Sequence, residues 1–78
     1  EHDGILVYPN PTEGHLTLTV DGCLGFGYHV YNLMGQCVMS GEVSGDETRL
    51  DLGHFNKGVY YISVRWNDNR LIKKVIVK

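Results

Sequence analysis

Residues 58–66 read Gly58-Val59-Tyr60-Tyr61-Ile62-Ser63-Val64-Arg65-Trp66, the longest run of strand-favouring residues in the chain. Every second side chain from Tyr60 to Trp66 is apolar, and the positions between them are mixed. A strand of this kind fits the middle of an antiparallel sheet that packs on a core. Turn residues 67–69 end the run and residues 70–78 return, so we predict a C-terminal hairpin over residues 58–78.

The rest of the chain reads as short strands separated by turns. Pro9 and Pro11 end the first strand, because each fixes φ and removes an amide donor. Residues 21–27 form a glycine-rich connection, residues 41–46 are polar and loose, and residues 51–56 allow at most a single helical turn. The predicted strands cover residues 5–8, 15–20, 28–32, 37–40, 48–52, 58–66 and 70–78. We therefore predict an all-β fold, a compact immunoglobulin-like β-sandwich of about seven antiparallel strands.

The composition indicates one small domain and excludes several classes of partner. The 78 residues carry a net charge of −2, which gives no electrostatic footprint for nucleic acid. No apolar run approaches the ~20 residues that a membrane-spanning helix needs. Residues 1–4 resemble a linker remnant, so residues 1–78 are interpreted as a single domain cut from a longer chain.

The histidines and the hydroxyl and carboxyl side chains do not predict a metal site or an active site. The four histidines are His2, His15, His29 and His54, and none lies within four residues of another. No zinc motif and no nucleophile motif accompanies them. We expect surface histidines, no cofactor, no metal and no enzymatic activity.

Cys23 and Cys37 are the two cysteines, and strand geometry argues against a disulfide between them. They fall near opposite ends of the hairpin predicted for residues 28–40, which at ~3.3 Å per residue separates them by more than ~10 Å. Bridged Cα atoms lie within ~7 Å of each other. We expect two free thiols, with Cys37 buried.

Aromatic residues of the organising strand offer an alternative function. Tyr60, Tyr61 and Trp66 would suit a platform for a sugar if they shared an exposed face. The preferred interpretation places Tyr60 and Trp66 in the core and Tyr61 on the ordinary outer face of the sheet.

Four motifs, in order and at the expected spacing, resemble one known family. They are Tyr8-Pro9-Asn10-Pro11, the turn in residues 30–36, Leu52 through Gly58-Val59-Tyr60, and the terminal run Lys73-Lys74-Val75-Ile76-Val77-Lys78. Together they resemble the C-terminal sorting domain of the type IX secretion system over residues 8–78. Gln36 departs mildly from the pattern, because a basic residue often follows the turn glycine. The cysteines are not part of the pattern.

The resemblance implies a sorting signal that addresses a passenger protein to outer-membrane secretion machinery in Gram-negative bacteria. It also implies transit through the periplasm, removal by a sortase-like surface protease, and attachment to the cell surface or release. The sorting motif would comprise Pro9, Asn10, Pro11, Gly35, Gly58, Tyr60, Lys73, Lys74, Val75, Ile76, Val77 and Lys78. The runner-up function is an extracellular immunoglobulin-like module that binds carbohydrate or mediates adhesion, and a purely structural accessory domain is the third reading.

Three local expectations follow for the motif residues. Gly35 or Gly58 should adopt a conformation that a Cβ atom disfavours. Val75 and Val77 should point inward near Ile62 or Val64, while Lys74 and Lys78 face solvent and Lys73 lies at the margin of the core. The terminal strand should lie at a sheet edge, which gives the isolated domain a tendency to form homodimers.

Overall fold

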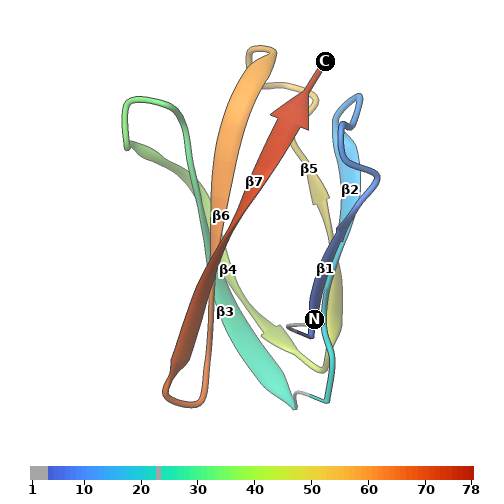
Figure 1. Cartoon of the computed structure of the whole chain (residues 1–78), viewed down its shortest axis with the longest axis vertical. Helices are drawn as coiled ribbons and strands as arrows, with labels where there is room; N and C mark the ends of the chain where they lie inside the picture. The colour runs from blue at the N-terminus through green and yellow to red at the C-terminus, as the bar shows by residue number, and fades with distance from the viewer. Residues whose placement is uncertain (1–3, 23) are drawn as a thin grey trace.

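The computed structural model describes residues 4–22 and 24–78, and these residues form seven strands and no helix. The strands are β1 (Ile5–Tyr8), β2 (His15–Val20), β3 (Gly25–Tyr31), β4 (Cys37–Ser44), β5 (Glu47–Asp51), β6 (Gly58–Trp66) and β7 (Asn69–Val77). A three-stranded sheet, β1-β2-β5, packs on a four-stranded sheet, β4-β3-β6-β7 (Figure 1). Every strand pair in the two sheets is antiparallel. The predicted immunoglobulin-like sandwich is confirmed.

The core lies between the two sheets, where the period-two alternation of each strand places its apolar side chains. On β2 this alternation buries Leu16, Leu18 and Val20, as predicted. The buried apolar cluster consists of Ile5, Leu16, Leu18, Val20, Phe26, Val30, Leu50, Leu52, Tyr60, Ile62, Val64, Val75 and Val77. Trp66 is half-buried and packs against this cluster.

Strand β6 lies in the middle of the four-stranded sheet, between β3 and β7, as its sequence predicted. Residues 67 and 68 make the tight turn from β6 to β7, and Trp66 pairs with Asn69 across it. Asn67 occupies the left-handed region at a φ of 53°, which asparagine tolerates better than most residues. The predicted C-terminal hairpin is therefore confirmed.

The boundaries of β3 and β4 differ from the prediction. Strand β3 begins at Gly25 rather than Tyr28, and β4 continues to Ser44 rather than ending at Ser40. Glycine weakens strand propensity, so the sequence around Gly25 and Gly27 read as a loop. In the fold, Phe26 between them is buried in the core, and its burial favours the extended conformation. Residues 53–55 form a non-helical turn closed by a 3.1 Å bond from the Phe55 amide to the Leu52 carbonyl.

Cys37 was predicted to be buried, and this prediction is wrong. Val30 pairs with Met39 and Tyr31 pairs with Cys37, so the register shifts by one residue at Val38. A β-bulge of this kind turns the residue beyond it to the opposite face of the sheet. Cys37 is consequently a free, exposed thiol, and Cys23 lies outside the described residues.

Candidate recognition site

All four sequence motifs gather at one end of the sandwich. The turn between β3 and β4, the start of β6 and the C-terminus all lie at this end, together with the connection from β1 to β2 (Figure 1). Strand β1 begins toward the opposite end. We call the end that carries the motifs the motif end. Motifs that lie far apart in the sequence are thus brought together, because the antiparallel strands return the chain repeatedly to this end.

The opening motif binds directly to the terminal strand. The Asn10 carboxamide donates from Nδ2 to the carbonyl of Lys74 at 2.9 Å and accepts at Oδ1 from the amide of Ile76 at 3.1 Å. These are the two bonds that a peptide group of a neighbouring strand would make. The Asn10 side chain therefore acts as a substitute for one residue of an additional strand beside β7.

Thr12 extends this contact toward the C-terminus. Its amide donates to the Ile76 carbonyl and its carbonyl accepts from the Lys78 amide, both at 2.9 Å, so that Thr12 forms a parallel bridge with Val77. Asn10 and Thr12 together engage four backbone groups along the outer edge of β7. We refer to residues 10–12 as the edge cap.

Hydrogen bonds within the following turn fix the position of the edge cap. Thr12 is buried, and its Oγ1 donates to the His15 carbonyl at 2.6 Å and accepts from the Gly14 amide at 3.0 Å. The Gly14 carbonyl in turn accepts from the Leu52 amide at 2.7 Å. The cap is thereby tied to the three-stranded sheet while it binds the edge of the four-stranded sheet.

The second motif forms a closed turn that displays two apolar side chains. Asn32 Oδ1 accepts from the amides of Met34 and Gln36, at 2.9 and 3.0 Å, and its Nδ2 donates to Gln36 Oε1 at 2.9 Å. Gly35 has a φ of 81°, as predicted. Gln36, the position that departs from the basic residue of the pattern, closes the turn here through its amide and side chain. Leu33 and Met34 are exposed.

The third motif stabilises the loop that enters β6. Tyr60 is buried, and its hydroxyl donates to the Asn56 carbonyl at 2.5 Å. Its ring lies 6.0 Å from that of Phe55 between centroids. Gly58 has a φ of 148°, so the prediction holds for this glycine as well as for Gly35. Leu52, Gly58 and Tyr60 together determine the shape of this loop, because the Leu52 carbonyl closes its first turn and the Tyr60 hydroxyl binds its Asn56 carbonyl.

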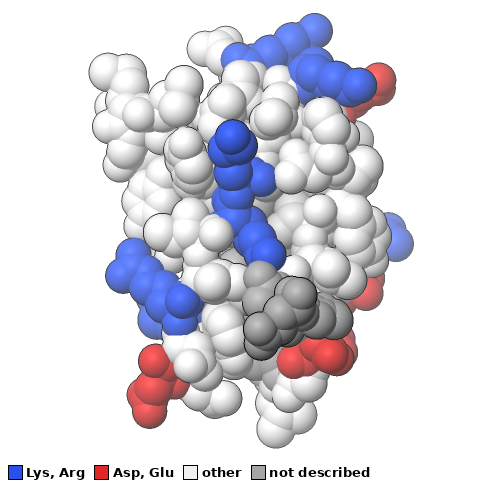
Figure 2. Space-filling view, in the orientation of Figure 1, with Lys and Arg blue, Asp and Glu red and all other residues white. Residues whose placement is uncertain are grey.

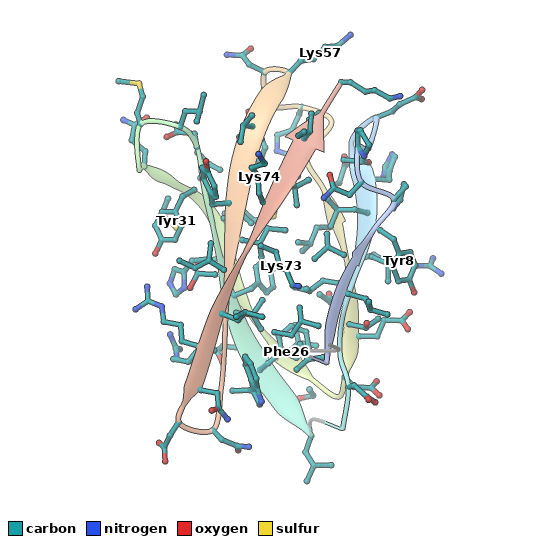
Figure 3. The ribbon with its side chains drawn as sticks, in the orientation of Figure 1. Tyr8, Phe26, Tyr31, Lys57, Lys73 and Lys74 are labelled. Carbon is teal, nitrogen blue, oxygen red and sulfur yellow. The ribbon has the colours of Figure 1, made fainter. Side chains whose placement is uncertain are left out.

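The terminal run follows the predicted alternation. Val75 and Val77 are buried, Lys74 and Lys78 are exposed, and Lys73 is half-buried. Lys73 extends from β7 toward the three-stranded sheet, whereas Lys74 lies on the other side of the strand (Figure 3). Lysine and arginine side chains run along the middle of this face and reappear at the motif end (Figure 2).

Val75 and Val77 were predicted to lie near Ile62 or Val64, and the pairing of β6 with β7 gives them different direct partners. Val75 lies opposite Tyr60 and Val77 opposite Gly58, while Ile62 faces Lys73 and Val64 faces Leu71. The two-residue turn after Trp66 determines this register, because it makes Asn69 the first paired residue.

The side chains that were considered for other chemistry are dispersed. Among residues 4–22 and 24–78, no three His, Cys, Asp or Glu side chains gather as a metal site would require. No helix of the described chain is long and apolar enough to cross a membrane. Tyr61 and Trp66 are five residues apart on β6, an odd separation that places their side chains on opposite faces of the sheet. They therefore do not form one platform for a sugar.

Sequence comparisons identify relatives of this arrangement. The family described as the secretion system C-terminal sorting domain matches residues 6–78. The ulvan lyase NLR42 of Nonlabens ulvanivorans is 31% identical over 72 residues, which cover 91% of this chain. The chain spans 14% of the length of that lyase.

Proposed function

The chain belongs to the family of secretion system C-terminal sorting domains, and from this premise we propose how its fold carries the signal. Domains of this family are sorting signals of the type IX secretion system, which takes proteins through the periplasm to the outer-membrane surface or the medium. The domain is recognised and is not itself the catalyst.

We place that surface on the terminal strand and the motif end. One observation carries this proposal: the opening motif and the terminal motif, more than 60 residues apart, form one hydrogen-bonded unit through Asn10, Thr12 and β7. The signal would then be a folded surface, with Lys73, Lys74 and Lys78 as its charged groups. The other motif residues, among them Gly35, Gly58 and Tyr60, would act by shaping the turns beside it.

The same proposal includes a passenger protein before the domain and removal of the domain after export. A passenger would precede residue 1, with residues 1–4 as the end of its linker. A sortase-like surface protease would remove residues 1–78 after export. The ulvan lyase relative illustrates how such a domain can form a small part of a longer protein.

A reporter protein fused upstream of the domain tests the function in a bacterium that has type IX secretion. Deletion of residues 71–78 should leave the reporter folded but retained in the periplasm, because the recognised strand is gone. The intact fusion should appear at the surface or in the medium. Equal export of both fusions would contradict the sorting role of this strand. Retention accompanied by an unfolded reporter would instead support a structural accessory domain.

A further inference from the structure

The outer edge of β7 divides into a covered half and an open half. Lys74, Ile76 and Lys78 direct backbone groups away from β6, since these groups bond to the edge cap. By the two-residue alternation of a strand, Arg70 and Ile72 direct their amide and carbonyl groups to the same side. No hydrogen bond from the described residues reaches these groups, and the Lys74 amide is likewise available. Residues 70–74 therefore form an open edge.

The other edges of the two sheets carry features that discourage strand addition. Strand β1 has only four residues, and β4 contains the bulge at Val38 and exposes Ser40, Glu42 and Ser44. Strand β5 exposes the charges of Glu47, Arg49 and Asp51. Short strands, bulges and outward charges are the usual protections of a sheet edge. The open half of β7 also carries outward charges, Arg70 and Lys74, but it belongs to a nine-residue strand without a bulge and places the apolar Ile72 between the two charges.

The side chains of the open edge specify the chemistry of a partner. Arg70, Ile72 and Lys74 alternate on the outer face of the sheet, and all three are exposed, Ile72 by 57%. An added strand places its side chains beside these three. The complementary strand would carry two carboxylates that flank an apolar residue, at period two.

We propose that residues 70–74 are the docking edge for an extended strand of the secretion machinery with this alternation of carboxylate and apolar side chains. The edge cap confines the added strand to these residues, because Asn10 and Thr12 already occupy the groups from the Lys74 carbonyl to the Lys78 amide. The inference rests on the proposed function and specifies which part of the terminal strand is bound.

Proline at position 72 tests the backbone contact. Ile72→Pro removes an amide that points away from β6, a place where an edge strand tolerates proline. Export of the reporter fusion should fall about five- to tenfold, the effect of one lost backbone hydrogen bond. The control Ile72→Val keeps the amide and a branched apolar side chain, and should export like the unmodified fusion. Normal export of a folded Ile72→Pro fusion would overturn the proposal.

Charge reversal gives a second test that does not depend on the proline variant folding. Arg70→Glu combined with Lys74→Glu should reduce export at least as strongly, because two carboxylates of the partner would meet like charges. Arg49→Glu on the exposed face of β5 is the matched control and should have no effect. If the proline variant melts at a much lower temperature than the parent, the comparison of the double charge reversal with Arg49→Glu tests the proposal instead. Normal export of the double reversal would overturn the proposal.

The deletion of residues 71–78 separates failure of this inference from failure of the sorting function. Retention on deletion, with normal export of both edge variants, would reject the docking edge alone. Normal export on deletion would reject the recognition of the terminal strand altogether.

Discussion

Individual side chains in this domain replace backbone partners where strands are missing. Asn10 substitutes for a strand residue beside β7, Asn32 closes the turn between β3 and β4, and Tyr60 satisfies the Asn56 carbonyl. A small domain buries a limited share of its surface, so that each such bond is a large fraction of its stability. These motif residues therefore have a structural role in addition to the recognition that we propose for the motif end.

Removal of the Tyr60 hydroxyl should destabilise the domain measurably. Tyr60→Phe keeps the buried ring and leaves the Asn56 carbonyl without its donor, at a cost of about 0.5–1.5 kcal/mol. Tyr31→Phe is the control, because the half-buried Tyr31 hydroxyl has no partner among the described residues. Urea unfolding of the two variants measures the difference. Equal stabilities would show that the bond to Asn56 contributes nothing.

At the scale of strands, two glycines beside each other in the β3–β4 region have different roles. A Cβ atom on Gly41 would lie 2.7 Å from the Tyr28 hydroxyl and 2.9 Å from the ring carbon that bears it. A Cβ atom on Gly27 would meet only the ends of Glu42 and Arg65, which form an exposed ion pair at 3.6 Å. The ring of Tyr28 thus covers Gly41 on the inner face, whereas flexible side chains cross Gly27 on the outer face.

Alanine substitution should therefore distinguish the two glycines. Gly41→Ala should cost about 1–3 kcal/mol, because the Tyr28 ring packs against the core and must move. Gly27→Ala should change stability by less than about 0.5 kcal/mol, since it displaces an ion pair of little worth at the surface. Thermal unfolding of both variants gives the comparison, and an equal loss would mean that Tyr28 relocates freely.

The elements that the sequence predicted correctly are those whose pattern is local. Alternation along β2, β6 and β7 was sufficient to identify Leu16, Ile62 and Val75 as core residues. The bulge at Val38 broke the same rule and exposed Cys37, because one extra residue reverses the faces and leaves no trace in composition. The contact of Asn10 with β7 was unpredictable for another reason: nothing in a Pro-Asn-Pro turn specifies which distant backbone its carboxamide reaches.

At the scale of the whole molecule, the edge cap bears on association. Strand β7 lies at the edge of its sheet and is joined to β6 by a two-residue turn. Open edges favour pairing with a second copy, and strand exchange is a low-cost route to dimers. We expect the isolated domain to form a minor dimer at high concentration.

Asn10→Ala should raise the dimer fraction, because it uncovers the Lys74 carbonyl and the Ile76 amide. Asn56→Ala, which leaves the backbone carbonyl used by Tyr60 in place, is the control. Light scattering after size exclusion measures the mass of each variant over a concentration series. Strictly monomeric behaviour of the parent and of Asn10→Ala would contradict this role of the edge.

The lysines of the terminal strand allow a test of whether the sorting signal lies in side-chain charge or in the strand backbone. Replacement of Lys73 and Lys74 by alanine should change the free energy of unfolding by no more than about 0.5 kcal/mol, as is usual for exposed charges. Lys74 is exposed, Lys73 lies at the margin of the core, and neither residue belongs to the buried apolar cluster. Export of a reporter fusion should nevertheless fall, since the docking edge loses the positive charge of Lys74.

Two measurements on the same double variant separate the explanations. Reduced export at an unchanged melting temperature would support a sorting signal that depends on side-chain charge. If the double variant is exported normally and only deletion of residues 75–78 causes retention, the sorting signal would lie in the strand backbone instead. A double variant that melts much earlier than the parent would show that these lysines are structural, because Val75 and Val77 alone would then fail to hold β7 in the sheet.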